Sequence, residues 1–136
     1  STKINVDSEE GGYSITTGKD GDGNDANFNF GSHAKVPANF PKDIPRPSDD
    51  YLITAMEIEE DGDKEIALSY QVEGNFEEWK GKYDDYLVNS GYEVDRLDFA
   101  STMYSLMGAK GETVLTISIM VEEDNDFFVL QLMYLY

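Results

Sequence analysis

The sequence predicts an α+β domain in which an antiparallel sheet of about four to six strands carries one helix on one face. Two observations lead to this prediction. A single segment, residues 75–90, has aromatic and aliphatic side chains at helical spacing. The segments on both sides of it alternate between apolar and polar residues, as strands joined by hairpins do. A polar N-terminal β-hairpin arm is predicted to precede this domain.

The predicted helix has a start signal, an apolar face and a stop signal. Asn75 is a typical N-cap residue, and Glu78, three positions later, completes a capping box. Gly91 stands where a C′ glycine ends a helix. The face that we expect to pack on the sheet consists of Phe76, Trp79, Tyr83, Tyr86 and Leu87.

From residue 51 onwards the pattern predicts the order β-β-α-β-β-β-β. The first two strands, residues 51–60 and 65–73, flank Asp61-Gly62-Asp63, which is a strong hairpin turn. The last strand is apolar on both faces, so we expect it to be central in the sheet or covered on its second face. Alternation in the first strand places Leu52, Thr54, Met56 and Ile58 on one face. The later extended segments are residues 92–98, 99–107, 113–121 and 127–136, with a turn at residues 108–111.

Composition divides the chain into three parts. Residues 1–35 are polar and rich in Gly, Asp and Asn, and they are predicted to form a β-hairpin and loop arm with its turn at residues 9–12. Residues 36–48 carry all four prolines and are predicted to be an extended connector that Phe40 and Ile44 attach to the domain. Residues 49–136 form the predicted α+β domain.

The net charge restricts the partners of this chain. Its 28 acidic residues outnumber 10 basic ones, which gives a net charge of −18. Nucleic-acid backbones and anionic membranes need clustered Lys and Arg, so binding to nucleic acid is not expected. The chain contains no cysteine, which excludes disulfides and thiolate chemistry. No run of about 18 apolar residues occurs, so no transmembrane segment is predicted.

One loop has the composition of a calcium site. Asp20, Asp22, Asn24 and Asp25 supply oxygen ligands in a glycine-rich turn, which is the ligand chemistry that Ca²⁺ prefers. An EF-hand loop counted from Asp20 needs Gly at its sixth position and Glu at its twelfth, and these positions hold Asp25 and Gly31. The alternative interpretation of this segment is a disordered polar loop.

Catalytic chemistry has few candidates. The only histidine, His33, lies in a predicted loop and is interpreted as a surface residue. Carboxylate pairs occur at 49–50, 77–78 and 84–85, but neighbouring residues usually point apart, so no hydrolase site can be assembled from them. Trp79 and the tyrosines form either a stacking platform or the core, and their shared helical face favours the core. The sequence therefore predicts a protein that is not an enzyme.

Two segments and a turn carry a family resemblance. They are NFPKDIPRPS at 39–48, FEEWKGKYDDYLVNSGY at 76–92, and Lys110-Gly111. Together they resemble small exported or lipid-anchored bacterial domains of uncharacterised function, in which an FPxDIPxP-like segment precedes a strand pair, a helix and late strands. The resemblance covers about residues 36–136. It implies the extracellular side of a bacterial membrane or secretion, and it carries no catalytic residue to this chain.

The combined expectation is a non-enzymatic bacterial cell-envelope or secreted binding module for an unknown protein or small ligand. Binding is expected at an exposed sheet face or a sheet edge, and a signal peptide or lipid anchor is expected upstream of Ser1. Two alternatives stay open, a Ca²⁺-responsive module that uses the 20–25 loop and an acidic inhibitor or immunity-type protein that covers a basic partner. A homodimer through the C-terminal strand is expected if the second face of that strand is uncovered.

Overall fold

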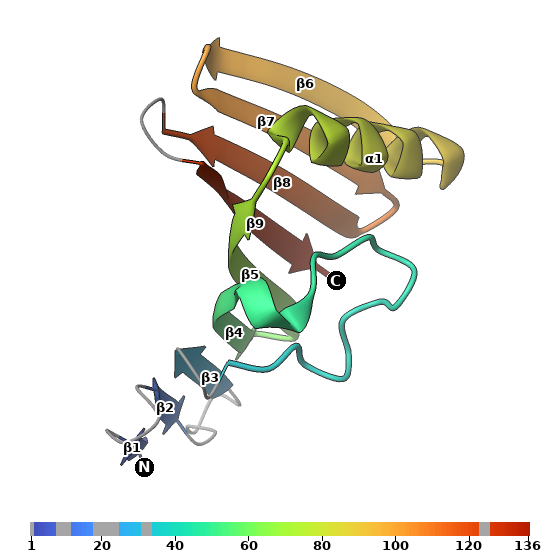
Figure 1. The fold of residues 1–136 in the computed structure, drawn as a ribbon. Coiled ribbons are helices and arrows are strands. Elements are labelled where there is room, and N and C mark those ends of the chain that lie inside the picture. Colours follow the sequence, from blue (N-terminus) through green and yellow to red (C-terminus); the bar gives the residue numbers. More distant parts are fainter. Residues whose placement is uncertain (1, 8–11, 18–24, 31–33, 123–125) are drawn as a thin grey trace.

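The computed structural model describes residues 2–7, 12–17, 25–30, 34–122 and 126–136. Its main feature is an open antiparallel sheet of six strands with one helix on one face (Figure 1), which confirms the predicted α+β class. The six strands lie in the order β4-β5-β9-β8-β7-β6. The elements are β4 (Leu52–Glu60), β5 (Asp63–Glu73), α1 (Phe76–Asn89), β6 (Glu93–Ala100), β7 (Met103–Lys110), β8 (Thr113–Val121) and β9 (Phe127–Leu135).

The order of these seven elements along the chain is the predicted one. The apolar C-terminal strand β9 lies between β5 and β8, so it is central, as expected. A short 3-10 helix, Asp49–Tyr51, leads into β4. In the backbone, three further strands continue the sheet beyond β4 in the order β3-β2-β1, and they are β1 (Thr2–Asp7), β2 (Gly12–Thr17) and β3 (Asp25–Phe30). The turn predicted at residues 9–12 lies largely outside the described residues.

The helix begins with the predicted N-cap. The side-chain oxygen of Asn75 accepts a hydrogen bond of 2.9 Å from the backbone N–H of Glu77, which satisfies one of the donors that a helix start leaves unpaired. The carboxylate of Glu78, predicted to complete a capping box, lies 3.6 Å from the Lys82 ammonium one turn later. Local side-chain chemistry therefore defines where α1 starts.

The helix ends as predicted at Gly91. This glycine adopts a left-handed backbone conformation, with φ of 83°, which residues with a Cβ rarely adopt. Its conformation lets the Tyr92 N–H reach back and donate to the Leu87 carbonyl at 3.0 Å, a Schellman-type bond. The chain thereby reverses into β6 immediately after the last helical turn.

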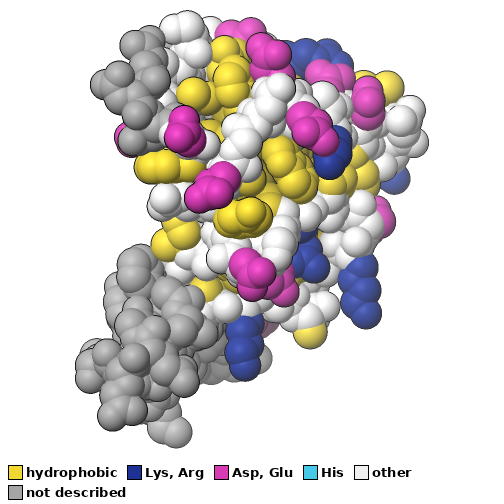
Figure 2. All heavy atoms as spheres, in the orientation of Figure 1, with side chains coloured by type: hydrophobic (Ala, Val, Ile, Leu, Met, Phe, Trp, Pro, Cys, Tyr) yellow, Lys and Arg dark blue, Asp and Glu magenta, His cyan; other side chains and the backbone are white. Residues whose placement is uncertain are grey.

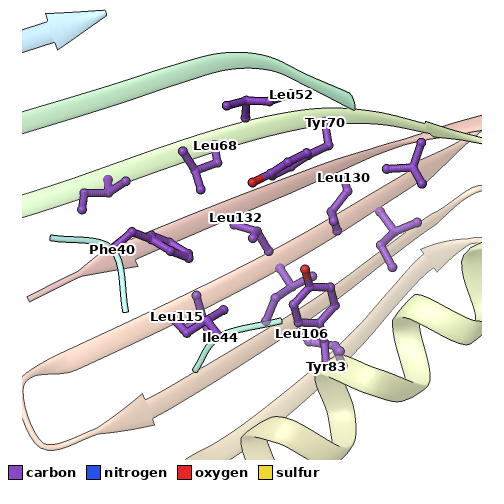
Figure 3. Packing of buried hydrophobic residues seen from close by; sticks show 14 of the residues in the cluster. Phe40, Ile44, Leu52, Leu68, Tyr70, Tyr83, Leu106, Leu115, Leu130 and Leu132 are labelled. Carbon is purple, nitrogen blue, oxygen red and sulfur yellow. The ribbon is translucent and has the colours of Figure 1, made fainter. Parts of the chain in front are cut away.

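The hydrophobic core lies between the sheet and a second layer made of α1 and residues 34–51 (Figures 1 and 3). Tyr83 and Leu87 enter the core from the helix. Phe40 and Ile44 enter it from the proline-rich connector, which confirms that they attach the connector to the domain. The sheet contributes the inward-facing side chains of its central strands, which include Ile66, Leu68, Tyr70, Leu115, Ile117, Leu130 and Leu132.

Two tyrosine hydroxyls join the helix to the connector. Tyr83 donates a hydrogen bond of 2.5 Å to the Pro45 carbonyl, and Tyr86 donates one of 2.8 Å to an Asp43 carboxylate oxygen. Burial raises the pKa of Tyr83 far above its ordinary value, so its hydroxyl stays protonated and remains a donor. The two halves of the second layer are thus bonded to each other as well as packed on the sheet.

A β-bulge in β4 contradicts the predicted face of that strand. The pairing register with β5 shifts between Leu52 and Thr54, so one extra residue lies in β4. Beyond the bulge, Ala55 pairs with Leu68 on the core face and is buried. Because a shift of one residue exchanges the two faces of a strand, the side chains predicted to accompany Leu52 point to the opposite side. They are Thr54, Met56 and Ile58.

The segment after the helix also differs from the prediction. β6 extends to Ala100 and β7 begins at Met103, so the chain turns at residues 101–102 inside the segment predicted as one strand. The turn predicted at 108–111 begins later, because β7 continues to Lys110. Of residues 108–111, only Gly111, with φ of 61°, belongs to the turn, which consists of residues 111–112. Gly108 is therefore a strand residue.

Candidate binding surface

The predicted calcium loop lies almost entirely outside the described residues. Asp20, Asp22 and Asn24 lie outside the described residues, and Asp25 is described only through the backbone of β3. His33 also lies outside them. Within the described ranges, no group of three or more His, Cys, Asp or Glu side chains lies close enough together to hold a metal ion.

In each of the three acidic pairs considered in the sequence, one carboxylate contacts a basic side chain. Asp49 accepts a hydrogen bond of 3.0 Å from Arg46, and Asp84 accepts one of 2.9 Å from Arg96 across the gap between α1 and β6. Glu78 is paired with Lys82 on the helix surface. One carboxylate of each pair is therefore held by a basic side chain of its own.

The Arg96–Asp84 pair leads to a prediction about titration. The hydrogen bond from Arg96 holds the pKa of Asp84 below its ordinary value of 3.8. A lowered folded-state pKa contributes stability at pH values above the unfolded pKa, and this contribution is lost as the pH falls through the folded pKa. We expect Arg96→Gln to raise the pKa of Asp84 towards 3.8 in a carboxyl-carbon NMR titration, whereas Lys82→Gln leaves it unchanged. An identical Asp84 pKa in the two variants would contradict the assignment.

The aromatic side chains of the helix pack as predicted. Phe76, Trp79 and Tyr86 are half-buried against the core, beside the fully buried Tyr83. The Lys82 ammonium lies 4.4 Å from the centroid of the Trp79 ring, so a cation already covers the indole. Figure 2 shows this helix-covered side, on which charged side chains of both signs surround a band of hydrophobic ones. The aromatic side chains thus serve packing here.

A cavity of about 590 Å³ lies at the N-terminal end of α1. Its apolar wall includes Phe76 and Phe127, and Glu73 and Asp126 supply carboxylates. Backbone N–H groups at a helix start attract anions. Here the two carboxylates oppose an anionic ligand, so the cavity lacks the charge that a phosphate or sulfate site needs.

The sheet face turned away from α1, which we call the open face, has a different composition. The pairing register of the strands places its side chains in rows that cross neighbouring strands, and two of these rows are rich in methionine. One row runs through Met107, Thr116, Met133, Ala67 and Met56, on five successive strands. A parallel row consists of Met103, Met120 and Val129, and a neutral polar row between them consists of Ser105, Ser118, Gln131, Ser69 and Thr54.

All five methionines of the chain lie on the open face. Met103, Met107 and Met133 are 38%, 40% and 38% exposed, and Leu97 on the neighbouring edge strand is 47% exposed. Sequence reasoning missed this surface. The available signal was the phase of the methionines, since Met120 alternates with the inward Ile117 and Ile119 of its strand.

On the six strands β4 to β9, the charged residues at open-face positions lie toward the perimeter and have one sign. Its register positions include acidic residues at two ends of the sheet and on β6, and the basic residues of the six strands occupy the opposite, helix-side positions. The acids on the open face are Glu60, Asp63, Glu65, Glu73, Glu93 and Asp95. The bases on the helix side are Lys64, Arg96 and Lys110.

Comparisons with family models, with curated proteins and with solved structures found no match to this chain. Among the described residues, α1 is too short and too polar to cross a bilayer.

Proposed function

We propose that this chain is a non-enzymatic binding module whose open face docks on a partner protein. The observation that carries the proposal is the gathering of all five methionines on one exposed sheet face. Large apolar groups exposed next to each other typically mark a site of interaction. Unbranched, polarisable methionine side chains adapt to partners of different shape, which suits a docking surface better than a catalytic one.

The dimensions of the open face support this role. Six strands spaced about 4.8 Å apart, each contributing roughly eight residues of about 3.3 Å, span a surface on the order of 700 Å². A standard protein–protein interface buries about 800 Å² on each partner. The face is thus large enough for a specific complex.

The proposed role includes a location. The resemblance of residues 36–136 to exported bacterial domains supports a module of the cell envelope or a secreted one. A lipid anchor upstream of Ser1 would hold the module outside the membrane, with the proline-containing connector at residues 36–48 joined to the domain by its buried Phe40 and Ile44. In intact cells, such a module is expected to be accessible to added protease.

Site-specific crosslinking tests the docking face. A photoreactive amino acid replaces Met107 or Met133 in the full chain, and it replaces Val88, which is 54% exposed on α1, as the matched control. We expect one defined adduct, identified by mass spectrometry, from positions 107 and 133 and none from position 88. Adducts from position 88 alone, or from no position, would contradict docking through the open face.

A further inference from the structure

We propose that the segment which occupies the open face is a cationic amphipathic helix, with its apolar side on the methionines and its Lys or Arg side chains at the acidic perimeter. This inference rests on the proposed docking role and specifies the chemistry of the partner. The acidic cavity at the start of α1 and the tyrosines beside Asp43 are smaller features with mixed surroundings. Of these three places, only the open face combines a broad exposed apolar centre with charge of one sign.

The charge distribution selects a cationic partner. Glu65, Glu93 and Asp95 border the methionine rows, and none of the basic residues of the six strands occupies an open-face position. The chain as a whole has a net charge of −18, so its long-range field also attracts cations. A partner with Lys or Arg on either side of an apolar stripe pairs with this perimeter and leaves no cation buried at the centre.

The centre of the open face suits an apolar stripe. Met107, Met133 and Met56 lie in one row with only Thr116 and Ala67 between them, so the row is continuous across five strands. A helix of about 18 residues is roughly 27 Å long, which matches the width of the sheet. Leucine side chains at helical spacing would then contact methionine side chains along the whole row.

A second copy of the chain and an anionic membrane both fit worse. In a face-to-face dimer, two chains of charge −18 would approach with acidic perimeters of the same sign, and the strands β4 to β9 supply no base at an open-face position to either perimeter. Like charges brought together at an interface oppose association. Anionic lipid headgroups meet the same repulsion. A second copy of the chain and an anionic membrane are therefore both tested as alternative occupants.

Methionine-methyl NMR on the full chain tests the inference directly. The probe is a synthetic peptide of about 18 residues with Leu and Lys at amphipathic helical spacing. A peptide of identical composition in scrambled order and a Leu/Glu peptide of identical spacing are the controls. We expect the Leu/Lys peptide to shift the methyl signals of Met107 and Met133 with saturation, and the two control peptides to leave them unchanged.

Two matched pairs of variants separate the apolar and the charge contributions. Met133→Gln is expected to weaken peptide binding about tenfold, whereas Val88→Gln on the exposed side of α1 leaves it unchanged. Asp95→Lys is expected to weaken binding and its salt dependence, whereas Asp85→Lys on the exposed side of α1 has a smaller effect. Thermal melting confirms that each variant is folded.

Four results would overturn the inference. Two concern the peptides: equal binding of the Leu/Glu peptide, and saturable binding of the Leu/Lys peptide that Met133→Gln does not weaken. The third is a dimer in sedimentation whose formation broadens the Met107 and Met133 signals. The fourth is binding of anionic vesicles at the same face. If no peptide binds while crosslinking at position 107 still identifies one partner, the inference fails and the docking role stands. If crosslinking at 107 and 133 also fails, both proposals fail.

Discussion

Tyr83→Ala is expected to lower the free energy of unfolding by about 3–5 kcal/mol. The ring is fully buried, and it stands where the helix, the connector and the sheet meet (Figure 3). Its removal leaves a cavity and breaks the hydrogen bond to the Pro45 carbonyl. Because a domain of this size is stable by only about 5–15 kcal/mol, this loss removes a large fraction of the total. Urea denaturation followed by circular dichroism measures it.

A pair of Tyr→Phe variants isolates the hydroxyl contribution. Tyr83→Phe keeps the ring but deprives the Pro45 carbonyl of its donor, and we expect a cost of about 1 kcal/mol. Tyr70 is buried equally well, but its hydroxyl has no hydrogen-bond partner among the described residues, although Arg46 lies near it. Tyr70→Phe is therefore expected to change stability by less than about 0.5 kcal/mol. Equal losses in the two variants would show that the hydroxyl of Tyr83 is not what joins the helix to the connector.

Gly108→Ala and Gly81→Ala are expected to change stability in opposite directions. A Cβ on Gly108 would lie 2.6 Å from Leu87 Cδ2 and 3.1 Å from Tyr92 Cδ1. Leu87 is fully buried, so it cannot move aside, and overpacking of this kind costs about 1–3 kcal/mol. Gly81 lies in the exposed part of α1, where a Cβ would meet no heavy atom within 4 Å, and alanine there favours the helix by about 0.5–1 kcal/mol. Urea denaturation of the two variants beside the parent chain measures both changes.

A double-mutant cycle checks the cause of the Gly108 effect. Leu87→Ala alone is expected to cost about 2–5 kcal/mol because it opens a cavity. The combination with Gly108→Ala is expected to cost less than the sum of the two single changes, since the new methyl group fills part of that cavity. Additive losses would mean that contact with Leu87 is not the reason why this position requires glycine.

The parts of the fold that local chemistry determines could be predicted from the sequence. Asn75 and Gly91 defined the ends of the helix, and Asp61-Gly62 defined a hairpin, because cap and turn residues act on their immediate neighbours. The bulge in β4 could not be predicted. The alternation from Leu52 to Ile58 continues without interruption, and only pairing with β5 reveals the extra residue.

The candidate surface was harder to predict than the fold. Alternation alone places Met56 on the same face as Leu52 and residues 99–107 in one strand, so it does not reveal that the methionines of β4 and β7 share a face with those of β8 and β9. Which residues adjoin across a sheet depends on strand order and register, and neither follows from the pattern of one strand. Gly108 shows the same difficulty, because its glycine-rich surroundings resemble a turn and its contact with Leu87 is a tertiary one.

Because every methionine lies on the open face, oxidation of methionine would change this surface and not the hydrophobic core. No methionine is among the buried core residues, so a mild oxidant such as peroxide would reach thioethers at the surface and leave the interior packing unchanged. Each sulfoxide formed would replace an apolar, adaptable side chain with a polar one. Oxidation is therefore expected to weaken docking through the proposed surface without lowering the stability of the domain beneath it.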